Sequence, residues 1–159
     1  MLASKSLVGL CSSASYSSVA ACAVFLARQV WLVDFEFSAP DGERPTPVCL
    51  VARELNSNQL VRLFADELQD RPPFSTDETT LFVAYFASAE IGCFLALGWN
   101  LPRRVLDLWT EQRVGTNGRP GVKRGLLDTL EYHGLDSIAA VEKTELRELA
   151  MQGGPYTES

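Results

Sequence analysis

Residues 31–37 read Trp-Leu-Val-Asp-Phe-Glu-Phe, an apolar run that ends in two carboxylates separated by one residue. Because side chains alternate along a β-strand, we expect Asp34 and Glu36 on the same face of a strand over residues 29–37. Two like charges held side by side repel each other, and a cation between them removes that penalty. Hard oxygen ligands at this spacing suit Mg²⁺ or Mn²⁺, whereas a solvated acidic face on an edge strand is the structural alternative.

Short turns separate this first strand from two further strands. Residues 47–53 read as a second strand after the turn at Asp41-Gly42, and residues 59–64 read as a third after a short turn of Asn and Ser. Short connections between neighbouring strands indicate an antiparallel meander. A helix over residues 58–69 is the competing interpretation of the third segment, because its apolar residues also follow a helical period.

The second half of the chain alternates between strands and helices. We expect a strand over 81–86, a helix over 87–97 closed by Gly98, a short strand entering a helix over 105–109, a loop over 115–121, and helices over 126–133 and 137–151. A meander of three strands followed by alternating strands and helices is the order found in ribonuclease H-like folds. The sequence therefore predicts an α/β domain with a mixed, ribonuclease H-like sheet.

The composition is that of an ordinary globular protein of 159 residues, which is long enough for one domain with a core. Its formal net charge of -6 argues against a protein that coats DNA, since such proteins are usually basic. An acidic balance remains compatible with a nuclease, whose metal site needs carboxylates. The four cysteines form no CxxC pair, so we expect no zinc site, and Cys49 and Cys93 read as buried free thiols of a cytoplasmic protein.

Residues 1–28 differ from the rest of the chain, because they are rich in Ser, Ala, Val and Cys and contain no acidic residue. Lys5, an apolar stretch and the run at 19–23 resemble a secretory signal, but serines and a tyrosine interrupt the apolar stretch at 12–18. The same interruption argues against a membrane span. We interpret residues 1–28 as a poorly ordered or adventitious extension, expect no contact with a membrane, and assign the folded domain to residues 29–159.

Four segments spread over residues 29–158 resemble the DEDD 3′→5′ exonucleases. They are Asp34-Phe35-Glu36, residues 82–90 ending in Glu90, residues 97–108, and residues 125–130. The first resembles motif I of that family, and the second is similar to the strand and helix that hold the acid of motif II. The chain as a whole is most similar to the proofreading domain of family A DNA polymerases, in the DNA polymerase I-like form of phages and bacteria.

This resemblance implies metal-dependent hydrolysis of phosphodiester bonds, with nucleotides removed from the 3′ end of DNA. Asp34, Glu36 and Glu90 would be the catalytic and metal-binding residues for two Mg²⁺ or Mn²⁺ ions, with Asp34 contacting both. The resemblance also implies single-stranded DNA or a DNA 3′ end as the substrate. A polymerase, as a fused domain or a separate partner, is the implied protein partner.

The chain departs from the family pattern at two places. Its second acid is Glu90 where the family has an aspartate, and Ala87 stands where an asparagine is usual. The family closes its site with a Tyr-x-x-x-Asp motif on a last helix, whereas this chain ends in Tyr156-Thr157-Glu158-Ser159. The resemblance therefore implies a domain truncated before motif III, with weak metal binding and impaired activity. The alternative is a ribonuclease H-like remnant that binds nucleic acid without hydrolysing it.

Asp107 and a basic segment complete the candidate site residues. Asp107 follows an apolar strand, so we expect either a helix N-cap or an additional metal ligand there. Residues 103–124 hold six basic residues against two acidic ones, and both a nucleic-acid contact and a solvated basic surface explain this excess. The candidate contact residues are Arg103, Arg104, Arg119, Lys123 and Arg124.

The single histidine and two of the tryptophans have structural interpretations. His133 precedes Gly134 at a helix end, where a cation is favourable, so we expect a capping role. Trp99 and Trp109 are expected as core or groove-wall aromatics, with stacking on an unpaired base as the alternative.

Overall fold

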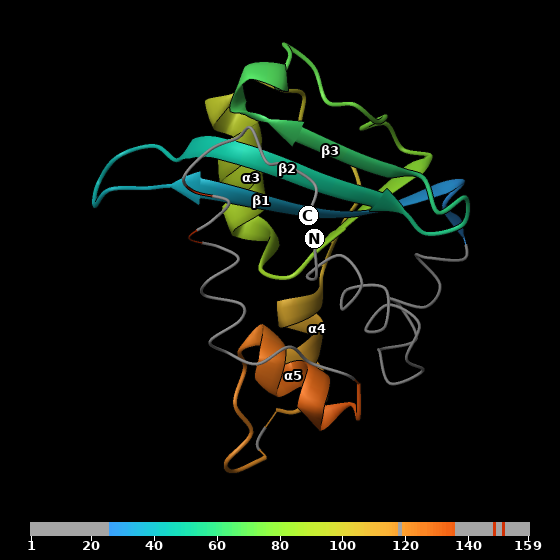
Figure 1. Cartoon of the computed structure of the whole chain (residues 1–159). Coiled ribbons are helices and arrows are strands. Elements are labelled where there is room, and N and C mark those ends of the chain that lie inside the picture. Colours follow the sequence, from blue (N-terminus) through green and yellow to red (C-terminus); the bar gives the residue numbers. More distant parts are fainter. Residues whose placement is uncertain (1–25, 118, 136–147, 149–150, 152–159) are drawn as a thin grey trace, which may run out of the picture.

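The computed structural model describes residues 26–117, 119–135, 148 and 151. Figure 1 shows one sheet, with helix α3 packed against it and helices α4 and α5 together below it in this view. The strands are β1 (Gln29–Ser38), β2 (Thr46–Glu54), β3 (Leu60–Phe64), β4 (Thr80–Ala84) and β5 (Val105–Asp107), and the helices are the 3₁₀ turn η1 (Ala65–Glu67), α3 (Ala87–Ala96), α4 (Leu108–Gly115) and α5 (Leu126–Tyr132).

The strands lie in the order β3-β2-β1-β4-β5. β1, β2 and β3 are antiparallel neighbours, whereas β4 runs parallel to β1 and β5 runs parallel to β4. Parallel neighbours need crossover connections, so α3 lies between β4 and β5 in the chain, in the parallel half of the sheet. The expected α/β class, with an antiparallel meander followed by alternating strands and helices, is confirmed.

β1 lies in the middle of the sheet because both of its faces are apolar. Trp31, Val33 and Phe35 are buried in one hydrophobic cluster with residues of α3. Val30 and Leu32 are buried in a second cluster with residues of α4 and α5. Alternate side chains of β1 therefore pack into two hydrophobic clusters, one on each face of the sheet. Each fully buried side chain of this size stabilises the fold by about 1.5–3 kcal/mol.

Phe94 of α3 fixes that helix on the sheet. Its ring makes edge contacts with Phe82 and Trp99 at centroid distances of 5.4 and 5.2 Å, and with Phe35 at 6.0 Å. The indole nitrogen of Trp99 donates to the backbone oxygen of Gln69 (2.7 Å), so the polar atom of this buried ring is satisfied. Because α3 is anchored by aromatic packing, the other side chains of α3 have defined positions relative to β1.

Two boundaries were decided by tertiary contacts. The third segment is a strand and not a helix, because β3 pairs with β2 along its whole length. The fourth strand ends at Ala84 and not at Phe86, because Phe86 adopts a left-handed backbone conformation (φ 69°, ψ 57°) that a strand does not accommodate. The short strand and helix expected near residues 105–109 are confirmed as β5 and α4.

The expected helix over residues 137–151 and most of the N-terminal extension lie outside the described residues. At the other boundary, the backbone nitrogen of Arg28 donates to the backbone oxygen of Thr79 (2.8 Å), and Ala27 packs against the second hydrophobic cluster. Ordered contacts with the sheet therefore begin slightly before residue 29.

Candidate functional site

Asp34 and Glu36 lie on the part of β1 that extends past β4. β1 pairs with β4 from Gln29 to Leu32, but it pairs with β2 as far as Ser38. Both acids are half-buried, and their alternate positions place them on the same face of the strand as Leu32. The sheet therefore presents two neighbouring carboxylates just beyond the carboxyl end of β4.

Glu90 reaches the same part of β1 from α3. Its side chain is 4% exposed, and its Oε2 accepts a hydrogen bond of 2.8 Å from the backbone nitrogen of Phe35. Phe35 is the residue between Asp34 and Glu36. Since the pairing with β4 has already ended there, the carboxylate occupies the position of a ladder acceptor and satisfies a buried backbone donor.

Burial and neighbouring charge together raise the pKa of Glu90 well above its ordinary value. Desolvation is the largest cause, and the negative charge of Asp34 comes next. The hydrogen bond from Phe35 opposes them, and the charge of Glu36 adds a smaller repulsion. The structure therefore brings Asp34, Glu36 and Glu90 close enough that their charges act on one another.

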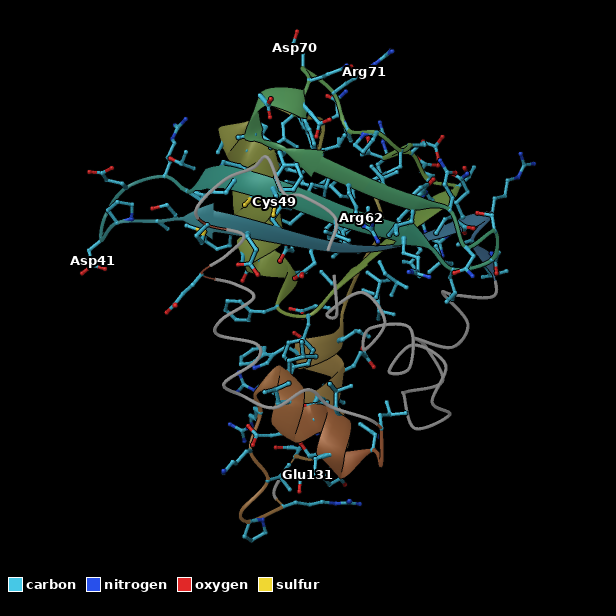
Figure 2. The ribbon with its side chains drawn as sticks, in the orientation of Figure 1. Asp41, Cys49, Arg62, Asp70, Arg71 and Glu131 are labelled. Carbon is cyan, nitrogen blue, oxygen red and sulfur yellow. The ribbon has the colours of Figure 1, made fainter. Side chains whose placement is uncertain are left out.

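Two buried thiols lie beside the same charges. Burial raises the pKa of Cys93, which follows Glu90 on α3, to about 12, and the charge of Glu90 contributes. Cys49 lies on β2 opposite Glu36 and is labelled in Figure 2. Burial raises its pKa, a hydrogen bond from the Glu36 backbone opposes this, and the charges of Glu36 and Asp34 raise it further. Both thiols are free and buried, as expected, and both stay protonated at neutral pH.

The donor chemistry of this region suits a hard divalent cation. Carboxylate oxygens are the ligands that Mg²⁺ and Mn²⁺ prefer, and a cation would neutralise the repulsion that raises the pKa of Glu90. Within residues 26–117 and 119–135, together with 148 and 151, no group of three or more His, Cys, Asp or Glu side chains is already arranged to hold a metal ion. Glu90 directs one carboxylate oxygen to the backbone of β1.

Asp107 is a helix N-cap, which was one of its two interpretations. Its carboxylate accepts hydrogen bonds from the backbone nitrogen of Trp109 (3.0 Å) and the hydroxyl of Thr110 (3.2 Å) in the first turn of α4. It also accepts one from the backbone nitrogen of Phe86, which precedes α3 (3.1 Å). Asp107 therefore ties together the starts of two helices, and any cation must compete with these donors for its oxygens.

The structure divides the basic candidate residues between the start of β5 and the connection between α4 and α5. Arg103 and Arg104 precede β5, and Arg103 pairs with Glu78, which precedes β4 (3.1 Å). The three carboxylates lie instead beyond the end of β4. Because β4 and β5 are parallel, these two arginines lie at the end of the sheet opposite the carboxylates.

The other basic candidates lie in the connection between α4 and α5. Tyr85, which directly follows β4, donates from its hydroxyl to the backbone oxygen of Arg124 (2.6 Å). Lys123 lies 3.7 Å from Asp128 of α5, and Arg119 forms a hydrogen bond to another side chain of that helix. The backbone of Arg124 therefore lies near the carboxyl end of β4, whereas Arg119 and Lys123 contact α5.

His133 follows α5 as its C-cap residue, as expected, but its surroundings do not favour a cation. One ring nitrogen forms a hydrogen bond with the side-chain oxygen of Gln112 (2.9 Å), and burial lowers the pKa of the ring. His133 therefore links α5 to α4 through this hydrogen bond.

Sequence reasoning missed Phe86 and Arg113 as candidate site residues. The ring of Phe86 is 46% exposed and lies edge-on to Trp109, with centroids 5.2 Å apart and planes at 83°. The guanidinium of Arg113 lies 4.5 Å from the centre of the same half-buried indole ring. The helical spacing of Trp109 and Arg113 was an available signal for their contact, whereas no local pattern indicated the position of Phe86.

No protein-family model matches the chain, and no curated protein matches it either. In the described part of the chain, no helix combines the length and the apolar character needed to cross a membrane.

Proposed function

We propose that this protein is a metal-dependent nuclease of ribonuclease H-like fold that removes nucleotides from the 3′ end of DNA. The observation that carries the proposal is the position of Glu90, a buried carboxylate with a raised pKa that accepts a hydrogen bond from the backbone nitrogen of Phe35, the residue between Asp34 and Glu36 in the chain. A buried carboxylate next to two others is costly unless a proton or a cation compensates its charge. Carboxylates with strongly perturbed pKa values concentrate at functional sites.

The topology supports the proposal. The strand order β3-β2-β1-β4-β5, with an antiparallel and a parallel half, is compatible with a ribonuclease H-like fold. In open α/β sheets, ligands bind outside the carboxyl ends of the strands. Asp34 and Glu36 lie past the end of β4, and Glu90 lies on the helix that begins there. The two segments that resemble motifs I and II of the DEDD exonucleases therefore meet in space.

Asp34, Glu36 and Glu90 would hold the Mg²⁺ or Mn²⁺ ions, which when bound activate water and stabilise the leaving 3′ oxygen. The remaining groups act on the substrate or on the framework. Arg119, Lys123 and Arg124 would contact the phosphates of single-stranded DNA. Asp107 holds the starts of α3 and α4 together at the same end of the sheet. Proofreading in the cytoplasm would further need a polymerase, as a fused domain or a separate partner.

A second candidate function is the binding of nucleic acid without hydrolysis. One observation favours it: in the part of the chain that the structure describes, the acids do not form a prepared group of three metal ligands. In that case the hydrogen bond from Phe35 to Glu90 is a structural cap for the free edge of β1. The basic connection between α4 and α5 would then supply the binding.

Release of mononucleotides from a 3′-end-labelled single-stranded oligodeoxynucleotide, with Mg²⁺ or Mn²⁺, separates these two functions. We expect release by the unchanged protein and none by Asp34→Asn, which keeps the size of the side chain and removes its charge. Glu43→Gln changes an exposed acid in the turn between β1 and β2, and it is expected to keep the full rate.

Release that persists in Asp34→Asn would contradict the proposed metal site. Binding of the oligonucleotide without release, at every concentration of either ion, would favour the non-catalytic function. An oligoribonucleotide in the same assay tests the preference for DNA, because the proposed contacts are to phosphates that both polymers share.

A further inference from the structure

Phe86 holds a backbone conformation that is rare for a bulky residue. Its φ of 69° and ψ of 57° lie in the left-handed region, at the N-cap of α3. Such conformations persist where the surroundings fix them, and they concentrate at functional sites. Here Asp107 fixes the backbone by accepting a hydrogen bond from the Phe86 nitrogen (3.1 Å). The consequence is a phenylalanine ring that is 46% exposed beside a well-packed core.

The exposed ring belongs to a group of three side chains, one from the residue before α3 and two from α4. Phe86 meets the ring of Trp109 edge-on at 5.2 Å, and the guanidinium of Arg113 lies 4.5 Å from the centre of that ring. A cation at this distance is attracted to the face of an indole. Because the carboxylate of Asp107 binds the backbone nitrogens of both Phe86 and Trp109, the two aromatic residues are held in a fixed relation.

We infer that Phe86, Trp109 and Arg113 form a stacking site for an unpaired base of single-stranded DNA. Aromatic rings, arginine and a basic groove are the means by which proteins hold single strands without reading their sequence. Charge complementarity favours a polyanion over a protein partner, since Arg113 is followed by Arg119, Lys123 and Arg124 in the next connection. The partner that combines exposed π-faces with a chain of negative charges is a single-stranded nucleic acid.

This inference rests on the proposed function and adds a substrate contact to it. Phe86 directly precedes α3, and Glu90 follows one helical turn later, so the stacking site and the carboxylates share the start of one helix. A base in a duplex has its faces covered by its neighbours, whereas an unpaired base is free to stack on protein rings. The stacking site would therefore select single-stranded substrate near the bond to be hydrolysed.

Tryptophan fluorescence tests the stacking site without catalysis. Trp31 and Trp99 are only 2% and 4% exposed, whereas Trp109 is half-buried, so a stacking ligand quenches mainly Trp109. The probes are an oligodeoxythymidylate of about ten nucleotides and an abasic oligonucleotide of the same length and charge, both with EDTA. We expect saturable quenching by the thymidylate and none by the abasic strand.

Two variants and a matched control locate the effect. Phe86→Gly removes the ring, and glycine adopts the left-handed conformation without strain, so we expect the melting temperature to stay within about 2 °C. Its affinity for the thymidylate is expected to fall roughly 5- to 100-fold. Arg113→Gln should weaken binding by a smaller factor, whereas Arg71→Gln should not, because Arg71 is an exposed arginine far from α4 (Figure 2).

Equal quenching by the abasic strand, or equal losses in Arg113→Gln and Arg71→Gln, would show general attraction to phosphate and overturn the stacking site. Unchanged affinity in Phe86→Gly would overturn it as well, and the exposed rings would then point to a protein partner. These measurements need neither a metal ion nor hydrolysis. A protein without nuclease activity can therefore pass them, and failure of the stacking site is distinguishable from failure of the proposed function.

Discussion

Two glutamates have nearly the same solvent exposure, yet their surroundings shift their pKa values in opposite directions. Glu54 at the end of β2 is 3% exposed, and Glu90 on α3 is 4% exposed. The pKa of Glu54 is lowered, whereas the pKa of Glu90 is raised well above its ordinary value. The difference lies in what each carboxylate meets after it leaves water.

Glu54 meets hydrogen-bond donors. Burial alone would raise its pKa, but hydrogen bonds from Ser57, Val30 and Asn56 outweigh burial. One oxygen accepts from the Val30 nitrogen (3.0 Å), and the other accepts from the nitrogens of Asn56 (3.0 Å) and Ser57 (2.6 Å) and from the Ser57 hydroxyl (2.7 Å). This carboxylate joins β1 to the turn after β2, and these hydrogen bonds compensate its negative charge.

Glu90 accepts a hydrogen bond from Phe35, but its other neighbours include two further acids. Burial therefore does not by itself mark a functional carboxylate in this protein. Desolvation is the largest cause of the raised pKa of Glu90 and the charges of Asp34 and Glu36 add to it, whereas hydrogen bonds outweigh burial at Glu54.

Glu54→Gln should lower the free energy of unfolding by about 2 kcal/mol, because the new amide group must face a backbone N–H that was bonded to an oxygen. Urea unfolding followed by circular dichroism measures the loss. Glu43→Gln in the exposed turn is the control, with an expected change below about 0.5 kcal/mol. Equal stability of the two variants would mean that the hydrogen bonds of Glu54 contribute nothing measurable.

Mg²⁺ at ten times its dissociation constant should stabilise the unchanged protein by about 1.4 kcal/mol, since it would bind the folded state alone. The shift in the midpoint of thermal unfolding, compared with NaCl at equal ionic strength, measures this gain. Glu90→Gln and Asp34→Asn should show a smaller shift because each loses a proposed ligand. A shift of the same size in all three proteins would remove Glu90 and Asp34 from the ion site.

Glu90→Gln should have the same free energy of unfolding as the unchanged protein at low pH. As the pH rises, the variant should become the more stable of the two proteins. The amide oxygen still accepts from Phe35, while the repulsion from Asp34 and Glu36 disappears. A carboxylate with a raised pKa binds its proton more tightly in the folded state, so the protein loses stability as the pH rises from about 4.3 through that pKa. Urea unfolding of both proteins between about pH 5 and pH 9 measures the difference.

Other titrating groups change the free energy of unfolding of both proteins equally, so their contributions cancel in the difference between the two. His133, whose pKa is lowered by burial, removes stability from both proteins as the pH falls. A difference that stays constant over the whole range would show that the charge of Glu90 is already compensated within the fold. A difference that shrinks with rising pH would contradict the direction of the pKa shift.

The two buried thiols should not react with a thiol reagent while the protein is folded. Cys93, with a pKa of about 12, and Cys49, with a raised pKa, are both buried and protonated at pH 8. With Cys11 and Cys22 replaced by serine, an aromatic disulfide reagent should label the protein only after unfolding in urea. Rapid labelling of the native protein would show that this side of the carboxylate region opens to solvent.

The local patterns of the chain predicted much of the fold. Alternation in residues 29–37 identified β1 and placed Asp34 and Glu36 on one face, and Gly98 and Gly134 marked the ends of α3 and α5. The third segment fitted two periods equally well, and only its pairing with β2 made it a strand. The left-handed turn at Phe86 was not predictable, because it is held by the distant carboxylate of Asp107.

The sequence by itself determined the elements, the α/β class and the pair of acids on β1, because these follow from periodicity and turn residues within a few positions of each other. The tertiary contacts determine which carboxylates lie near other negative charges and which are compensated by hydrogen bonds. Glu54 and Glu90 look alike in the sequence, but one ends beside the donors of Ser57 and the other beside Asp34. The physical reason is that a pKa depends on burial and on charges brought together from distant segments, and only the folded chain creates those surroundings.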